Sequence, residues 1–357
     1  MEKRLNFSIV EPGNVRIPVY EENTNTKGPV YWGPENSFPQ FVNMLYTESA
    51  TVRAIIDGTA FYICGNGINI NEGAAKFREK ANSQGQTLND VCEQLAIDLM
   101  KLNGFALQII YNKLGDIAEL YALDMTRVRV SSDGKKIYYA KKWGQYTGKY
   151  KCYDAFDRKH IDPSNPTQIY YYKGSARTVY PRPVWEGAFR DALAEINASK
   201  LVLNAMANGL AAKSVITLPN DNGLLTDDEK DAIEKSIKTK FTGPDADSSF
   251  FLYFREQGQG DIKIDTIKQE DESPKFVNYK KSARENIFTS FRCSPNIFGL
   301  PNNNQGVFSK DSYKDAFELY NKTQVKPRQK QIERAFDTIF AAKDAIKFLP
   351  FDIENKD

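Results

Sequence analysis

The chain has 357 residues, with 48 basic and 46 acidic side chains and a formal net charge of +2. This length predicts two or three subdomains rather than one core, and a hydrophobic content of 41% excludes wholesale disorder. The near balance of charge argues against a protein that coats nucleic acid through its net charge, but it is compatible with DNA running along a locally patterned surface.

Counts of single residue types exclude several kinds of site. The cysteines, Cys64, Cys92, Cys152 and Cys293, are scattered without a CxxC pair, which predicts neither a zinc site nor a disulfide framework and fits a reducing cytoplasm. His160 is the only histidine, and we expect it in a solvated loop, because catalytic triads and most zinc sites need histidines with partners. No apolar run is long enough to span a membrane, and no signal-peptide core follows Met1. We expect no metal, no cofactor and no membrane partner.

The N-terminal third begins irregularly and continues as helices. Proline and glycine are frequent in the first 40 residues, which predict an irregular segment with one short strand; residues 1–29 form an N-terminal arm that lies across a neighbour or stays mobile. Apolar spacing predicts helices over 41–46 and 51–64, and Gly65-Asn66-Gly67 ends the second of them. A phosphate loop at this glycine pair is disfavoured, because a strand follows it rather than a helix.

The next segment predicts a helix followed by a series of strands. Residues 88–102 form the helix, capped by Thr87 or Asn89, and Leu114-Gly115-Asp116 is a hairpin turn. The strands are expected at 105–112, 117–123, 128–130, 136–140, 149–153 and 169–172.

A long helix over about 185–212 is rich in alanine and glycine. Small residues indicate close packing against a neighbouring helix, or simply high helix propensity, and the sequence leaves both readings open. After a strand at 214–218, Thr226 and Glu229 form a capping box that opens a helix. Strands at 250–254 and 262–267 complete a small unit that is inserted between two long helices.

The last third predicts a helix, a polar loop and a second helix. Phe276, Ala283 and Ile287 share one face of a helix that ends before Pro295. A segment rich in asparagine, glycine and proline follows. The second helix begins at Ser309 or Ser312, is interrupted at Pro327 and resumes to Phe340.

This order of elements resembles the phage portal protein family. The resemblance rests on Cys293-Ser294-Pro295-Asn296-Ile297-Phe298-Gly299-Leu300 between two helices, on Phe308-Ser309-Lys310-Asp311-Ser312-Tyr313, and on a long helix that carries Pro327. It implies an α+β fold with a wing, a two-helix stem, a small α/β clip and a long kinked helix, and with a minimal or absent crown. The implied parts are the arm 1–29, wing 30–184, stem helix 185–213, clip 214–272, stem helix 273–294, tunnel loop 295–309, long wing helix 310–341 and tail 342–357.

The resemblance also implies a function in the virion. Portal proteins form a ring, usually a dodecamer, at one capsid vertex, through which double-stranded DNA is packaged and ejected without sequence specificity. The implied partners are the terminase large subunit, the major capsid protein and a head–tail adaptor, and assembly takes place in the host bacterial cytoplasm. We therefore expect a protein that is not an enzyme.

The resemblance places candidate site residues in three regions. Asn302, Asn303, Asn304, Gln305 and Lys310 are expected to line the channel at the tunnel loop; Lys275, Lys280, Lys281 and Arg284 are basic residues of the stem; and Asp227, Asp228, Glu229 and Asp231 are expected on the clip, where terminase or an adaptor docks.

Two other functions stay open. The acidic cluster at the clip could serve a metal-dependent nucleic-acid enzyme, although acids at a helix N-terminus also complement the helix dipole. Another oligomeric head–tail adaptor is the third possibility, but adaptors are usually shorter and lack two long helices around an insert.

Overall fold

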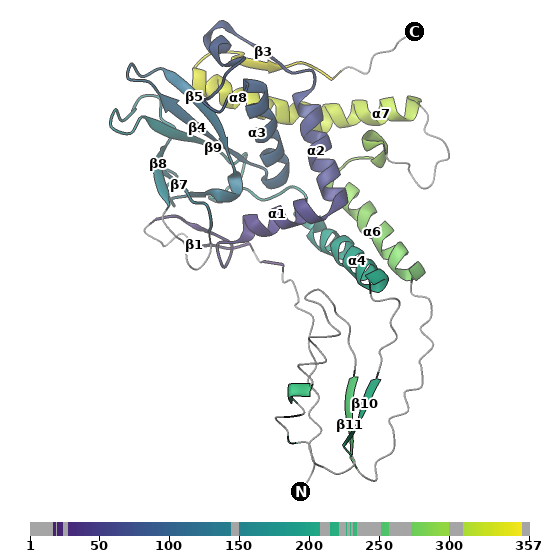
Figure 1. Ribbon diagram of the computed structural model, residues 1–357. Helices are drawn as coiled ribbons and strands as arrows, with labels where there is room; N and C mark the ends of the chain where they lie inside the picture. Colours follow the sequence, from purple (N-terminus) through teal and green to yellow (C-terminus); the bar gives the residue numbers. More distant parts are fainter. Residues whose placement is uncertain are drawn as a thin grey trace. The chain divides into compact units, whose positions relative to one another are not determined.

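The computed structural model describes residues 17–18, 20–23, 28–143, 150–207, 215–220, 226, 229, 231–233, 251–256, 273–299 and 310–351. The chain divides into two compact units, of which unit 1 comprises 1–192 and 285–357 and unit 2 comprises 193–284. Helices and strands are mixed along the chain, which confirms the predicted α+β class (Figure 1).

Unit 1 is built on a six-stranded sheet. Its strands, in spatial order, are β5 (Ile117–Leu123), β4 (Phe105–Tyr111), β9 (Thr167–Tyr172), β8 (Lys151–Ala155), β7 (Lys136–Tyr139) and β6 (Val128–Val130). Only β8 and β9 pair in parallel, and the other neighbours are antiparallel. All of the strands expected between residues 105 and 172 are therefore present, and the predicted hairpin joins β4 to β5.

Three helices of unit 1 pack in a layer beside this sheet. They are α1 (Phe38–Glu48), α2 (Ala50–Cys64) and α3 (Leu88–Leu102), and α3 contacts α2 on one side and β4 and β5 on the other (Figure 1). The Thr87 hydroxyl accepts a hydrogen bond from the Asp90 amide, and the Asp90 carboxylate accepts one from the Thr87 amide. Thr87, one of the two predicted caps, therefore begins α3, and it does so through a capping box that was not predicted.

The segment after residue 342 differs from the predicted tail. Ile346–Phe348 forms β12, which pairs antiparallel with β3 (Ile68–Ile70). Ile346 is fully buried there, and the Leu349 amide also donates to the carbonyl oxygen of Gly67 at 2.8 Å. The pairing joins segments almost 280 residues apart, which a local sequence pattern does not reveal.

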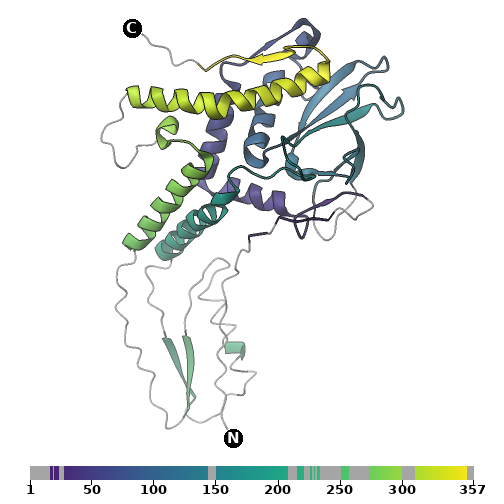
Figure 2. The same ribbon diagram turned by 180° about the vertical axis from the view of Figure 1, so that it is seen from behind.

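The long C-terminal helix is interrupted before the predicted position. α7 (Lys310–Tyr320) continues through one π-helical stretch, Asn321–Val325, into α8 (Lys326–Phe340), and Figure 2 shows the three as one continuous rod. Pro327 is the second residue of α8, directly after the π-helical stretch, and it has no N–H to donate to the preceding turn of the rod. Tyr320 and Val325 are both buried at a spacing of five residues, which is the repeat of a π-turn.

The buried centre of unit 1 contains a cation and two large aromatic side chains. Arg129 is fully buried between the rings of Trp32 and Trp143, and its NH1 donates to the carbonyl oxygens of Thr126 and Val128. Burial lowers the pKa of Arg129 to about 10. The Trp32 ring stacks on Tyr180 with centroids 4.3 Å apart, so residues just before the first long helix belong to this core.

The described part of the N-terminal arm lies against its own chain. The Glu22 carboxylate accepts hydrogen bonds from the amides of Val179, at 3.0 Å, and Tyr180, at 2.8 Å, and the Tyr20 hydroxyl donates to the Tyr180 carbonyl oxygen at 3.0 Å. β1 (Glu22–Asn23) and β2 (Tyr31–Trp32) form a second strand pair where one short strand was expected.

In unit 2, β10 (Val215–Asn220) and β11 (Phe251–Glu256) correspond to two of the predicted strands, and they pair in parallel, which the sequence analysis did not predict. Thr226 and Glu229 form the predicted capping box. The predicted strand 262–267 lies outside the described residues. α4 (Phe189–Ala207) and α6 (Ser273–Phe291) each have residues in both units.

Candidate functional site

The candidate site in unit 1 is the base of the segment 300–309, which lies between the 3-10 turn Pro295–Phe298 and α7. Ile297 is buried, and its carbonyl oxygen accepts a hydrogen bond from the Tyr62 hydroxyl. Phe298 lies so close to α2 that a Cβ built on Gly58 would be 2.7 Å from its ring. The chain is thus fixed to α2 immediately before the segment begins.

Aromatic side chains from several elements surround this base. The Phe298 ring lies 6.3 Å from that of Phe288 in α6 and 6.2 Å from that of Tyr320 in α7, so Phe298 packs against both helices. The hydroxyls of Tyr320 and Thr59 lie 2.6 Å apart. Burial, followed by the hydrogen bond with Tyr313, raises the pKa of Tyr62, so this cluster is neutral at physiological pH.

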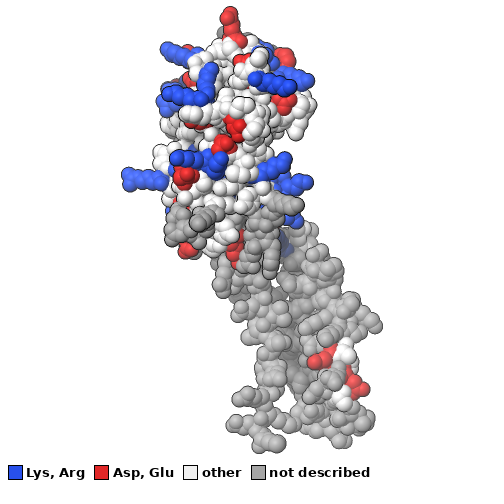
Figure 3. All heavy atoms as spheres, turned by 90° about the vertical axis from the view of Figure 1, so that its left-hand side faces the viewer, with Lys and Arg blue, Asp and Glu red and all other residues white. Residues whose placement is uncertain are grey.

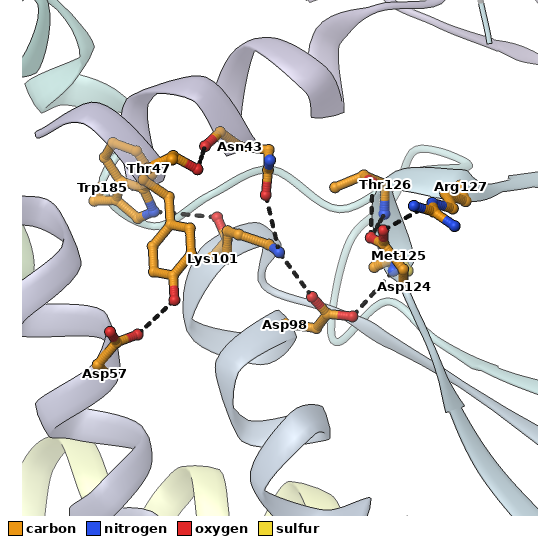
Figure 4. A network of polar contacts seen from close by, with 11 residues as sticks. Asn43, Thr47, Asp57, Asp98, Lys101, Asp124, Met125, Thr126, Arg127 and Trp185 are labelled. Atoms are coloured by element: carbon orange, nitrogen blue, oxygen red, sulfur yellow. Dashed lines mark hydrogen bonds and ion pairs between the residues drawn. The ribbon is translucent and has the colours of Figure 1, made fainter. Parts of the chain in front are cut away.

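A polar network ties α3 to the start of the first long helix (Figure 4). The indole N–H of Trp185 donates to the carbonyl oxygen of Lys101 at 3.1 Å. The Lys101 ammonium lies 3.1 Å from one carboxylate oxygen of Asp98, and the other oxygen accepts a hydrogen bond from the Met125 amide at 3.0 Å. Burial raises the pKa of Asp98, while Lys101 opposes this shift.

Within unit 1, the beginning of α4 and the end of α6 are side by side. The rings of Trp185 and Phe291 stack with centroids 5.4 Å apart. The Asn286 side-chain amide donates to the Asp191 carboxylate at 2.8 Å. The two long helices are therefore held together at their unit 1 ends by one aromatic contact and one polar contact.

The small residues of α4 divide between two environments. Ala192 and Ala198 are buried within the described chain, as is Ala188 in the 3-10 turn before α4, whereas Ala194 is exposed. Close packing within the subunit therefore accounts for several of the alanines. In unit 2, the exposed apolar side chains of the long helices are Leu201, Val202, Leu203 and Tyr279, among the residues that the structure describes.

Only one of the five predicted channel residues lies in the described part of the structure. Asn302, Asn303, Asn304 and Gln305 lie outside the described residues, and Lys310 is the first residue of α7. On α6, Lys275 is in the first turn, Lys280 and Lys281 are exposed, and Arg284 is half-buried.

Of the predicted clip acids, Asp227 and Asp228 lie outside the described residues, and Asp231 is exposed on a helical turn. Glu229 accepts hydrogen bonds from the amide of Thr226, at 2.9 Å, and from its hydroxyl, at 3.0 Å. These bonds lower the pKa of Glu229, and they give this acid a capping role in its own helix.

The only histidine lies at an exposed position, as the sequence analysis expected. His160 is 82% exposed and pairs with Asp157 at 2.8 Å. No group of three metal-binding side chains, and no helix long and apolar enough to cross a bilayer, occurs among the described residues. On the face that Figure 3 shows, basic and acidic side chains of unit 1 are interspersed rather than gathered in separate patches.

The sequence analysis missed one regular pattern of charge. Lys322, Lys326, Lys330 and Arg334 recur every fourth residue, and all four are exposed along the rod of α7 and α8. The signal was visible in the sequence, because side chains four residues apart share one face of a helix.

These elements, a mixed wing-like unit from which two long helices leave and return before a loop and a kinked helix, define a portal-like fold. Two solved structures share this fold, and a third is similar at a lower score. The neck of an empty gene transfer agent particle computed with C6 symmetry matches with a TM-score of 0.60 at 16% identity, over 92% of this chain and 87% of that chain. The neck of the native particle computed with C12 symmetry matches with a TM-score of 0.59 at 16% identity, over 93% and 88%. A portal protein of the HK97 family from Corynebacterium diphtheriae matches with a TM-score of 0.49 at 15% identity, over 86% and 94%.

The family model described as "Phage portal protein" matches residues 68–356. The chain therefore belongs to the phage portal protein family, as its sequence motifs indicated. No curated protein sequence matches it.

Proposed function

We propose that this chain assembles into a ring at one capsid vertex and that double-stranded DNA passes along its axis during packaging and ejection. Membership of the phage portal protein family is the observation that carries the proposal. Twelve copies are expected, and a related fold in a particle neck with C12 symmetry supports this number. The ring belongs to the virion and assembles in the host bacterial cytoplasm.

The proposed parts follow the predicted boundaries. Residues 30–184 and 310–341 form the wing, 185–213 and 273–294 the stem, and 214–272 the clip. The clip docks the terminase large subunit and later a head–tail adaptor, and the ring contacts the major capsid protein. Removing 219–268 should abolish terminase binding while the wing remains folded; normal binding by this variant would show that the docking surface lies elsewhere.

Residues 295–309 form the proposed tunnel loop. Ile297 and Phe298 fix the base of the loop against α2. This rigid base supports the proposal that the tip, Asn302 to Gln305, extends from it into the channel. Uncharged amides can touch phosphates without holding them, because each fixed cationic contact would add salt-dependent affinity.

The test of ring formation is the mass and the symmetry of the purified assembly. We expect closed rings in electron micrographs and a native mass twelve times the 40.5 kDa of one chain. A chain that stays monomeric under all conditions would contradict the proposal. Divalent-metal-dependent cleavage of DNA would favour the enzyme alternative, and rings that join a tail without supporting packaging would favour an adaptor.

The test of the loop is the variant N302D/N303D/N304D/Q305D, with four alanines at the same positions as the control. Added negative charge in a confined channel should reduce the length of DNA packaged per particle, most strongly at low salt, where the Debye length is long. Rings should form in normal yield. Wild-type packaging by the aspartate variant would show that the loop does not line the channel.

A further inference from the structure

α8 carries a row of exposed cations that begins at its first residue. Lys326, Lys330 and Arg334 are all exposed, while Ile332, Phe336 and Ile339 bury the opposite face. Residues four apart rise about 6 Å along a helix and turn by roughly 40°, so the row extends for about 12 Å. We call Lys326, Lys330 and Arg334 the basic row.

The acids of the same helix are turned away from this row. A Glu333 carboxylate oxygen accepts a hydrogen bond from the Phe348 amide at 3.1 Å, and an Asp337 carboxylate oxygen accepts one from the Ala345 amide at 2.8 Å. Both acids therefore accept hydrogen bonds from the segment that contains β12. Lys322, one turn before the row, is neutralised by Glu318 at 2.6 Å.

Among the residues that the structure describes, no ion pair joins the basic row to an acid. Glu318, which pairs with Lys322, also interacts with Lys326 through charge, but without a direct contact. Ion pairs are present elsewhere on the surface, for example Lys136 with Asp154 at 2.5 Å and Arg182 with Glu186. In a chain whose net charge is +2, three cations outside ion pairs on one helical face form a local positive potential.

We propose that the basic row is a contact surface for the phosphate backbone of double-stranded DNA, separate from the channel loop and the stem. The inference rests on the proposed function, since it names a second place where the ring meets its DNA. One strand of a duplex rises 3.4 Å per phosphate, so a row of roughly 12 Å faces three to four phosphates. Lysine and arginine at this spacing hold a backbone without reading its sequence.

The composition of this face favours a polyanion over a protein partner. Protein interfaces have an apolar core surrounded by a polar rim. Among the described residues, α8 exposes no large hydrophobic side chain, and its other exposed residues are Pro327 and Thr338. On α7, Leu319 is the one large hydrophobic side chain of the rod that the structure describes as exposed, seven residues before Lys326. A surface with cations and small side chains offers charge to a duplex but little apolar area to another subunit.

The test uses the assembled ring and a closed circular duplex of several hundred base pairs. A closed circle cannot thread the channel, so its binding reports outer surfaces rather than the axis. The variant is K326Q/K330Q/R334Q. The matched control is K80Q/K113Q/K135Q, which removes the same charge from three exposed lysines of unit 1 that lie outside α8.

We expect the wild type and the control to bind the circle equally, and the basic-row variant to bind it more weakly. The slope of log affinity against log salt should fall by roughly 2.7 for each contacting copy, at about 0.9 per phosphate contact. For one contacting copy, the ratio of the wild-type affinity to the variant affinity should therefore fall roughly 40-fold between about 50 and 200 mM salt. Each single glutamine variant should remove roughly one third of the slope change.

Three outcomes would overturn the inference. Equal binding by the basic-row variant and the wild type would exclude the row as a DNA surface. Equal losses in both triple variants would show that total charge matters rather than the row. Loss of ring formation by the basic-row variant, with its helical content intact, would assign the row to a contact between copies. Failure of the wild type to form rings would instead contradict the proposed function.

Discussion

Gly58 of α2 lies directly against the ring of Phe298: a Cβ built on this glycine would be 2.7 Å from two of the ring carbons. Such a contact is shorter than real side chains adopt, so glycine is required here by space rather than by a positive φ. The contact fixes the base of the proposed tunnel loop, two residues before the segment 300–309. It therefore couples the packing of α2 to the position from which the loop extends.

Gly58→Ala should destabilise unit 1 by up to about 2 kcal/mol. Overpacking costs about 1–3 kcal/mol, and the gain in helix propensity, about 1 kcal/mol, offsets part of it. The measurement is the free energy of unfolding in denaturant. Gly187→Ala is the control, because a Cβ there has its nearest neighbour, the Ser290 hydroxyl, at 3.7 Å.

A smaller ring at position 298 should rescue the variant. Phe298→Leu alone loses aromatic packing, but Gly58→Ala combined with Phe298→Leu should be less destabilised than the sum of the two single changes. Additive effects would show that the alanine is accommodated without moving Phe298.

The buried pair Asp98 and Lys101 gives a second prediction. Lys101→Met leaves the Asp98 carboxylate buried without its cation, which should cost about 3–5 kcal/mol at neutral pH. Asp98→Asn combined with Lys101→Met removes both charges and keeps an acceptor for the Met125 amide, so it should be nearly as stable as the wild type. Strict additivity in this double-mutant cycle would exclude the coupling.

The same pair predicts a pH dependence with a definite sign. Burial raises the pKa of Asp98, and Lys101→Met removes the interaction that lowers it. A carboxyl whose folded-state pKa is raised contributes stability that is fully present below its unfolded pKa, near 3.8, and is lost as pH rises through the raised value. The deficit of Lys101→Met relative to the wild type should therefore shrink between neutral and acid pH, and a constant deficit would contradict this assignment.

Local patterns predicted most helices and strands of unit 1. The Thr87 capping box, the turn at Gly115 and the glycines after Cys64 each act over a few residues, so their signals are present in the sequence. The exposed position of His160 followed from the same local reasoning.

Other features depend on contacts that no short window contains. β12 exists because β3, far away in the chain, offers it a partner. An arginine is expected at the surface, because its charge is costly to bury. Carbonyl oxygens and two indole rings nevertheless surround Arg129 in the core. The basic row was visible as a four-residue repeat, but its significance depends on Glu333 and Asp337 turning toward β12.

Exposed leucines on α4 predict a contact between subunits of the proposed ring. Leu201 is 51% exposed and Leu203 is 64% exposed, so Leu201→Glu with Leu203→Glu should change the stability of the monomer by less than about 0.5 kcal/mol per site. Ring formation should be strongly reduced, as judged by native mass. Asn197→Glu, at an exposed polar position of the same helix, should leave rings intact. Rings of normal size from the double variant would place the contact elsewhere.

The π-turn predicts an unusual sensitivity to deletion. Tyr313, Phe317 and Tyr320 form the apolar side of α7, and Ile332 and Phe336 belong to that of α8. Each residue of an α-helix turns the helix by roughly 100°. In an uninterrupted α-helix the spacing of the two sets would exceed a whole number of turns by about one residue, so their directions would differ by roughly 100°. The extra residue of the π-turn removes this difference, so that both sets face the interior.

Deleting Thr323, which is exposed within the π-turn, should convert the rod to a regular α-helix and turn the apolar side of α7 out of the core. Loss of the buried Phe317 and Tyr320 contacts should cost about 3–5 kcal/mol or more. Amide hydrogen exchange should then accelerate over 310–320 while α3 and β4 remain protected. Thr323→Ala is the control and should behave like the wild type, because it changes the side chain without changing the phase. Unchanged protection of α7 after the deletion would mean that the helix absorbs the phase change elsewhere, and that the π-turn does not set the direction in which α7 packs.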